Sequence, residues 1–69
     1  MKQEIVKALM HDAEAGRFIA ETDIKILLNN PVGVGDHPNV LETIQGKLDE
    51  LCKHKDRLDA LALYFYEEE

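Results

Sequence analysis

The chain has 69 residues and a single cysteine, Cys52, so it forms one domain at most and cannot be stapled by an intrachain disulfide. Its formal net charge is −6, which excludes a protein that grips nucleic acid phosphates through a basic face. No apolar run approaches the roughly 18 residues of a membrane span, and no signal core follows the first methionine, so the composition predicts a cytoplasmic protein that binds neither nucleic acid nor membrane.

The first predicted element is a helix over residues 2–29, where apolar and small residues recur every three or four positions. Gly16 costs about 1 kcal/mol relative to alanine and leaves two alternatives, a continuous helix or two helices with the second capped at Thr22. Its place between Ala13 and Ala20 favours the continuous helix, because small residues let another helix approach closely. The predicted face comprises Ile5, Leu9, Ala13, Gly16, Ala20, Ile24 and Leu27.

Residues 29–39 hold both prolines and two of the four glycines. Two asparagines before Pro31 predict the end of the first helix, because the residue before a proline is pushed out of the α region. Asp36 or Asn39 can cap the next helix, and Pro38 suits its first turn. The glycines have no preceding strand and lack the spacing of a dinucleotide fingerprint, so they indicate loop closure.

The second predicted helix covers residues 38–66 and contains a heptad seam with alternating steps of three and four. One member of the seam, Lys55, is polar and is expected to reach Asp12 or to extend into water. Cys52 is expected to be a small core or interface residue. The seam comprises Leu41, Ile44, Leu48, Leu51, Lys55, Leu58, Ala62 and Phe65.

The predicted fold class is all-α: residues 1–69 form a single helical hairpin domain with antiparallel helices over about 2–29 and 38–66. Reflecting the chain about the centre of the loop places Ala20 near Leu48 and Gly16 near Cys52.

Two helices share only one seam, and here the flanks of both helices are also apolar. The first helix has a second stripe of Ala8, Ala15, Ile19 and Ile26, and the second adds Val40, Leu61 and Leu63 outside its heptad positions. A lone hairpin would leave these groups in water, so we expect a homodimer, or a higher oligomer, in the form of a four-helix bundle. A compact three-helix monomer folded at Gly16 is the alternative. The predicted oligomer interface comprises Ile5, Leu9, Ala13, Gly16, Ile19, Ala20, Ile26, Leu48, Leu51, Leu58 and Leu61.

Candidate reactive groups do not converge on a site. His11 and Glu14 have a spacing that could share a metal, but the Glu-x-x-His pattern of di-iron bundles is absent. Asp56 and Asp59 have the spacing of a magnesium-binding pair, yet the first helix offers no matching acids, so they indicate a solvated face. No histidine is placed to activate Cys52. The sequence therefore predicts no catalytic residue, no metal ligand and no cofactor.

The C-terminus is the most distinctive stretch, with Tyr64, Phe65 and Tyr66 followed by three glutamates. These aromatic residues could anchor another protein while the acids meet a basic rim. Alternatively, the tyrosines pack across the end of the bundle and the glutamates only keep it soluble.

The stretch from Glu4 through Leu28, followed by Asn29-Asn30-Pro31-Val32-Gly33-Val34-Gly35-Asp36-His37, resembles small uncharacterised proteins of marine T4-like cyanophages and ocean metagenomes. The resemblance implies a phage-encoded protein that acts in a bacterial cytoplasm. It implies no catalytic residues.

Three classes of function fit these features. The preferred interpretation is a homodimeric protein–protein interaction module, acting in assembly or as an adaptor. A small acidic helical enzyme or metal-binding protein is the first alternative. An acidic mimic that inhibits a host nucleic-acid-binding protein is the second.

Overall fold

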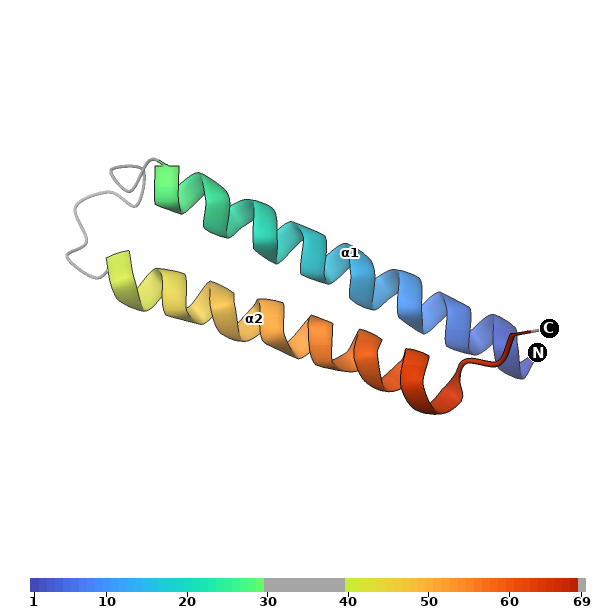
Figure 1. The fold of residues 1–69 in the computed structure, drawn as a ribbon. Helices are drawn as coiled ribbons and strands as arrows, with labels where there is room; N and C mark the ends of the chain where they lie inside the picture. Colours follow the sequence, from blue (N-terminus) through green and yellow to red (C-terminus); the bar gives the residue numbers. More distant parts are fainter. Residues whose placement is uncertain (30–39, 69) are drawn as a thin grey trace.

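The computed structural model describes residues 1–29 and 40–68, which form an antiparallel pair of helices (Figure 1). Helix α1 spans Lys2–Asn29, and helix α2 spans Val40–Ala60 and continues into a π-helical turn, η2, at Leu61–Phe65. No strand occurs among the described residues. The predicted all-α hairpin is confirmed. The predicted caps of the second helix fall within residues 30–39, outside the described part of the chain.

Helix α1 runs through Gly16 without a break, so the continuous helix is the correct alternative. The two ends of the chain lie side by side, at the end of the hairpin away from the connection between the helices (Figure 1). The principal extents are 51 × 15 × 14 Å, and the radius of gyration is 15.4 Å. A compact domain of this length would have a radius of gyration of about 11 Å, so the hairpin is a rod.

The hairpin seam is the strip along which α1 and α2 touch, and α1 supplies its fully buried part. Four apolar residues of α1 are less than a tenth exposed, whereas no residue of α2 is fully buried. Two of the four are alanines, which allow the helix axes to come close together. The buried residues are Val6, Ala13, Ala20 and Ile24. Half-buried residues face them from α2 at Val40, Ile44, Lys47, Leu51, His54 and Leu58, and from η2 at Leu61.

The register of the two helices differs from the predicted one by two residues. A Cβ atom built on Gly16 would lie 2.5 Å from the ring of His54, and Lys47 Nζ lies 3.3 Å from Asp23 Oδ2. The prediction that Gly16 faces Cys52 is therefore wrong. Two residues turn a helix by about 200°, so Cys52 points away from α1 and is exposed. The prediction that Cys52 is a core residue is therefore also wrong.

The seam positions of α2 also differ from the predicted heptad. Lys55 is exposed, and its Nζ donates a hydrogen bond to Asp59 Oδ2 at 2.8 Å instead of reaching Asp12. Lys47 and His54 are the polar residues of α2 in the observed seam. The observed and predicted seams have the same three-and-four spacing and share Ile44, Leu51 and Leu58, so spacing alone does not separate them. The predicted seam residues that prove exposed are Ile5 and Leu9 on the first helix, and Leu41, Leu48, Lys55, Ala62 and Phe65 on the second.

The helical part of the chain ends at Phe65, one residue before the predicted boundary. The Tyr66 amide donates a hydrogen bond to the Leu61 carbonyl oxygen at 2.9 Å, which closes η2. Tyr66 itself is extended, with φ −78° and ψ 130°. The wider π turn re-aims the last aromatic side chains relative to an ideal α-helix.

Candidate interaction surface

The residues predicted to form an oligomer interface separate into two groups. Ala13, Gly16 and Ala20 line the hairpin seam on α1. Leu51 and Leu58 of α2 and Leu61 of η2 are half-buried against this seam. These side chains hold the single hairpin together. The other group is exposed in the single chain: Ile5 at 53%, Leu9 at 50%, Ile19 at 61%, Ile26 at 59% and Leu48 at 41%.

Four of these exposed residues belong to one stripe along α1. Steps of four and three residues place seven positions on one side of the helix, roughly 100° around from the seam. We call this the α1 stripe; it comprises Ile5, Leu9, Asp12, Gly16, Ile19, Asp23 and Ile26. Its large side chains are spread over the whole length of α1, so the stripe could cover a second helix from end to end.

The side of the hairpin that carries the α1 stripe is hollowed along its length. One hollow, of about 340 Å³, is lined by Leu9 of the stripe together with Leu61 and Phe65 of η2. A second lies beside Gly16 and Ile19 in the middle of the rod, and a third lies beside Ile26. The hollows follow the small residues of the seam, because alanine and glycine leave room at the edge of the helix contact. Large aliphatic side chains and hollows therefore alternate along this side of the hairpin.

The charges on this side are nearly balanced, although the whole chain carries −6. Asp23 pairs with Lys47 at 3.3 Å, and Asp12 and Arg57 line the same hollow. Glu50 accepts a hydrogen bond from Lys53, which holds the pKa of the Glu50 carboxyl below its usual value. Two copies of the protein could therefore approach through this side with little like-charge repulsion.

His54 marks the closest approach of the two helices. Its ring lies against the backbone of Gly16, and only 17% of its side chain is exposed. Its Nε2 atom is 3.7 Å from Glu50 Oε2, while Nδ1 is buried and has no hydrogen-bond partner. Glycine at position 16 is required by this contact, because any side chain there would occupy the space of the imidazole.

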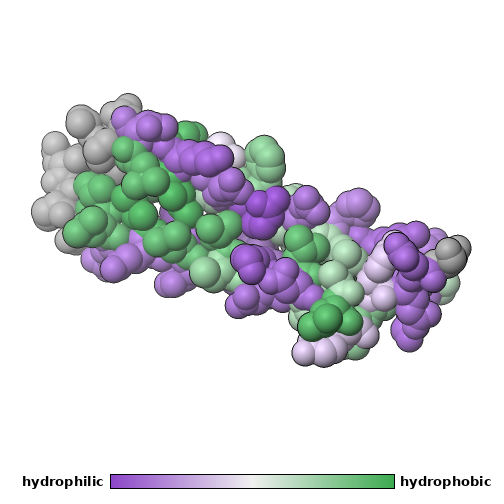
Figure 2. Space-filling model, in the orientation of Figure 1, coloured by the Kyte–Doolittle hydropathy of each residue, from purple (hydrophilic) through white to green (hydrophobic). Residues whose placement is uncertain are grey.

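The opposite side of the hairpin presents another apolar patch. Leu41 and Leu48 follow the seam positions of α2 by one residue and so turn away from the α1 stripe. Hydrophobic side chains gather over both helices near the end where α1 stops and α2 begins (Figure 2).

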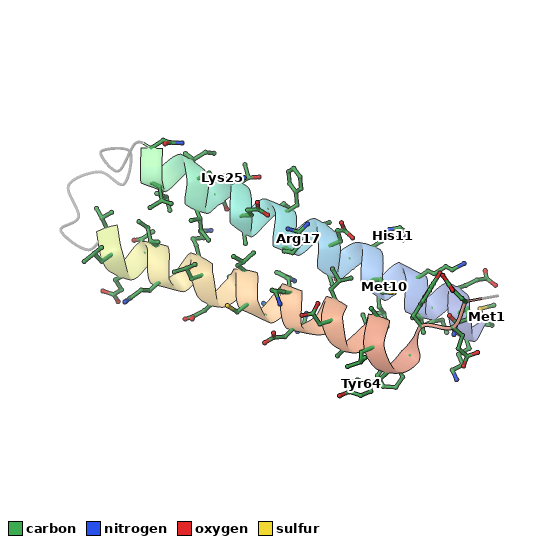
Figure 3. The ribbon with its side chains drawn as sticks, in the orientation of Figure 1. Met1, Met10, His11, Arg17, Lys25 and Tyr64 are labelled. Atoms are coloured by element: carbon green, nitrogen blue, oxygen red, sulfur yellow. The ribbon has the colours of Figure 1, made fainter. Side chains whose placement is uncertain are left out.

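Arg17 lies on that same side and is flanked by acids of its own helix (Figure 3). Its guanidinium contacts Glu21 Oε1 at 2.7 Å and Glu14 Oε1 at 3.8 Å. Lys25 approaches the same Glu21 carboxyl at 3.1 Å. The hydrogen bond from Lys25, together with the positive charges of Lys25 and Arg17, lowers the pKa of Glu21. These pairs solubilise the outer surface of α1 without forming a site.

The side-chain amide of Gln3 ties the two ends of the hairpin together. Its Nε2 donates a hydrogen bond to the Phe65 carbonyl oxygen at 3.2 Å, and its Oε1 accepts one from the Glu67 amide at 3.0 Å. Lys2 Nζ lies 3.6 Å from Glu67 Oε1. Helical periodicity gives no hint of this contact, because it depends on the turn of the chain after η2.

Replacing Gln3 by alanine should release the C-terminal end without unfolding the hairpin. The two lost hydrogen bonds are exposed, so we expect a loss of about 1–2 kcal/mol in local stability. Amide hydrogen exchange at Glu67 should become markedly faster, while exchange at the seam residue Ala20 should stay unchanged. Gln45→Ala, an exposed glutamine on α2, is the matched control. Unchanged protection at Glu67 in the Gln3→Ala protein would show that the contact is absent in solution.

The three aromatic residues predicted to bind a partner point in different directions. Tyr64 is 73% exposed and lies on the side of η2 away from α1 (Figure 3). Phe65 is 53% exposed and lines the hollow of about 340 Å³ with Leu9. Tyr66 is 39% exposed and lies beside Met10 of α1. Leu63, also 73% exposed, accompanies Tyr64 at the outer surface.

Within residues 1–29 and 40–68, no three histidine, cysteine or acidic side chains are close enough to hold a metal ion. Asp59 is engaged by Lys55, whose pKa is raised by the hydrogen bond to this carboxylate. Asp56 and His11 are exposed. His37 lies outside the described residues.

Comparisons with known protein families, with curated proteins and with solved structures found no match to this chain. No helix in the described part of the structure is both long enough and apolar enough to cross a membrane.

Proposed function

We propose that this protein is a protein–protein interaction module that acts in assembly or as an adaptor, and that its working form is a homodimer in which two hairpins form a four-helix bundle. The observation that supports the proposal is the row of exposed aliphatic side chains along α1. Ile5, Leu9, Ile19 and Ile26 are each at least half exposed, and they lie on one side of a single helix. Large exposed aliphatic side chains that gather on one side of a molecule often mark an interaction surface.

The exposed area of the chain supports the same proposal. The chain exposes 5457 Å², whereas a compact monomer of 7.9 kDa would expose about 4,400 Å². The excess is close to the roughly 800 Å² per partner that a stable protein–protein interface buries. A second hairpin placed over the α1 stripe would cover an area of this size. The proposal places the dimer in the cytoplasm, where the exposed thiol of Cys52 stays reduced, and the resemblance to cyanophage proteins adds an infected bacterium as the setting.

The proposal requires thermal stability to depend on protein concentration, because folding and association are coupled when the dimer is the stable form. We expect the melting temperature, followed by far-ultraviolet circular dichroism, to rise by several degrees over a hundredfold increase in concentration. By mass action, a hundredfold increase in protein concentration stabilises the folded dimer by about 2.7 kcal/mol. A melting temperature independent of concentration over this range, together with the mass of one chain, would exclude the homodimer.

We further propose that the C-terminal end contacts another protein. Leu63 and Tyr64 are both exposed, and the acids Glu67 and Glu68 follow them closely in the sequence. A partner that offers a hydrophobic pocket with a basic rim fits this chemistry.

Tyr64→Ala should lose the partner protein that the wild-type chain retains from a bacterial extract, while it remains a dimer. Truncating an aromatic anchor of this kind typically costs 2 kcal/mol or more in binding, or about 30-fold in Kd. Phe18→Ala is the matched control, because Phe18 is an exposed aromatic residue that lies away from this end of the rod. Equal retention of the same partner by both variants would argue against the C-terminal contact.

A further inference from the structure

The α1 stripe has a counterpart from the second helix on the same side of the hairpin. Residues of α2 and η2 line the three hollows beside the α1 stripe, and they recur in steps of three and four. One side of the rod therefore carries two parallel rows, one from each helix. We call the second row the α2 stripe; it comprises Thr43, Lys47, Glu50, His54, Arg57, Leu61 and Phe65.

The two stripes match level by level along the rod. The ring of His54 lies against Gly16, and Lys47 Nζ lies 3.3 Å from an oxygen of Asp23. Residues at the same level therefore have numbers that add to about 70, and the shared hollows agree with this rule. The remaining levels pair Ile5 with Phe65, Leu9 with Leu61, Asp12 with Arg57, Ile19 with Glu50, and Ile26 with Thr43.

We infer that the homodimer has its two-fold axis parallel to the rod, so that the α1 stripe of each copy packs on the α2 stripe of the other. The inference rests on the proposed function, and the occupant of this side of the hairpin is a second copy of this chain. Rotation about such an axis leaves every residue at its own level. Each residue of the α1 stripe therefore faces, across the interface, the α2 residue with which it is level in its own chain, and the register cannot slide.

Opposite charges meet across the interface at two levels. Asp12 faces Arg57 of the partner subunit, and Asp23 faces Lys47 of the partner subunit. Symmetry repeats each pair, so acids and bases alternate around the axis, and such alternation is favourable. Within residues 1–29 and 40–68, neither Asp12 nor Arg57 forms an ion pair in its own chain, so both charges are available to the second copy.

Apolar groups meet at the levels closest to the C-terminal end. Ile5 faces Phe65 of the partner subunit, and Leu9 faces Leu61 of the partner subunit, beside the hollow of about 340 Å³. Ile5, Leu9 and Phe65 are each about half exposed in the single chain, so these contacts would cover a large part of the exposed apolar surface at this end.

The level of Ile19 is mixed, because Ile19 faces Glu50 of the partner subunit. The Glu50 carboxylate keeps Lys53 as an ion partner at 3.0 Å in its own chain, and half of its side chain is exposed. The aliphatic part of this side chain can therefore cover an isoleucine while the charged end stays in water.

The other two-fold stacking of this side is less complementary. An axis perpendicular to the rod and beside Gly16 would place α1 on α1 and α2 on α2. Leu9 would then face Asp23 of the partner subunit, and Lys47 would face Leu61 of the partner subunit. Each of these contacts occurs twice and sets a charge against an apolar group, which desolvates the charge without pairing it.

The parallel axis brings the two C-terminal ends to the same end of the four-helix bundle. The contact proposed for Tyr64 is therefore present twice at that end. A pair of identical contacts suits a partner protein that is itself two-fold symmetric, because both contacts can be made at once.

Charge reversal at one level tests the arrangement in the full chain. Asp12→Arg and Arg57→Asp proteins should each dimerise about tenfold more weakly than the wild type, because like charges meet twice across the axis. Mixing the two variants should restore the wild-type Kd within about threefold, since each contact at this level then holds one acid and one base. Both positions are exposed, and circular dichroism checks that each variant stays helical.

Native mass spectrometry separates the mixed dimer from the two homodimers by mass. Random pairing of equal amounts gives as much mixed dimer as homodimer, and we expect a ratio of at least about ten. In the stacking with a perpendicular axis, positions 12 and 57 do not face each other, so pairing would not favour the mixed dimer. Random pairing in a wild-type protein that has the mass of a dimer overturns the inference and leaves the proposed function standing. A wild-type protein with the mass of one chain overturns both.

Cross-linking gives a second readout that does not depend on charge. In a Cys52→Ser background, Ile5→Cys and Phe65→Cys proteins are mixed to allow subunit exchange and treated with a short bis-maleimide. The matched control is Ile5→Cys mixed with Ile26→Cys, a pair that meets only about the perpendicular axis. We expect about tenfold more mixed covalent dimer from the first mixture, because positions 5 and 26 lie roughly 30 Å apart along the rod about a parallel axis. Equal or greater cross-linking in the control mixture would overturn the inference.

Discussion

Replacing Ala13 by aspartate should abolish the folded hairpin. Ala13 is 2% exposed and lies in the narrow part of the seam, so the new carboxylate would be buried with no partner. An uncompensated buried charge costs about 3–5 kcal/mol. A chain of this length has a free energy of unfolding of roughly 3–10 kcal/mol, so the substitution removes most of its stability. Far-ultraviolet circular dichroism at 25 °C should show the loss of most helical signal.

Ala15→Asp is the matched control for this change. Ala15 is exposed and is two residues along the same helix, which turns it about 200° away from Ala13. Both variants lose the same intrinsic helix propensity, so their difference reports burial alone. Equal helical signals from the two variants would show that Ala13 does not lie in the seam.

Replacing Ile19 by glutamate should dissociate the dimer while each hairpin stays helical. Ile19 is 61% exposed in the single chain and occurs twice in a two-fold interface. Losing its burial costs roughly 1.5 kcal/mol in each copy, before the desolvation of the new carboxylates is added. The Kd should therefore rise at least about 100-fold, as measured by sedimentation equilibrium.

Phe18→Glu separates this effect from a general loss of surface hydrophobicity. Phe18 is 62% exposed, almost the same as Ile19, but it lies about 100° further around α1, away from the stripe. It should leave the Kd unchanged within about threefold. A similar weakening by both substitutions would mean that association is not confined to the α1 stripe.

Much of the fold could be predicted from periodicity. The apolar spacing of residues 2–29 predicts the bounds of α1 as the structure has them, and the three small residues Ala13, Gly16 and Ala20 indicate the close helix contact. Gly16 does not break the helix, because the imidazole of His54 packs where a side chain would lie.

The register could not be predicted in the same way. A heptad in α2 is flanked by two possible columns, one through Val40 and Lys47 and one through Leu41 and Leu48. Hydrophobicity favours the leucines, yet the column with Lys47 and His54 faces α1. Lys47 is stabilised there by Asp23, and His54 is accommodated by Gly16. These contacts with individual residues of α1 decide which column of α2 faces the seam, although the other column has more apolar residues. They can be recognised only when the positions of both helices are known.

Periodicity predicts only part of the candidate interaction surface. Ile19 and Ile26 are recognisable as a second stripe, whereas Ile5 and Leu9 are assigned by spacing to the seam and prove exposed. The reason is that Val6 and Ala13, seven residues apart, define the true seam and shift it by part of a turn. The Gln3 contact with the chain end could not be anticipated, because it depends on η2 replacing the last α-helical turn.

The molar mass in solution tests the central claim most directly: the α1 stripe is a surface that only a second copy covers. Multi-angle light scattering on the eluting wild-type protein should give twice the chain mass of 7.9 kDa at high concentration, with a decline toward one chain mass on dilution. A mass of one chain at every concentration, up to the solubility limit, would contradict the account.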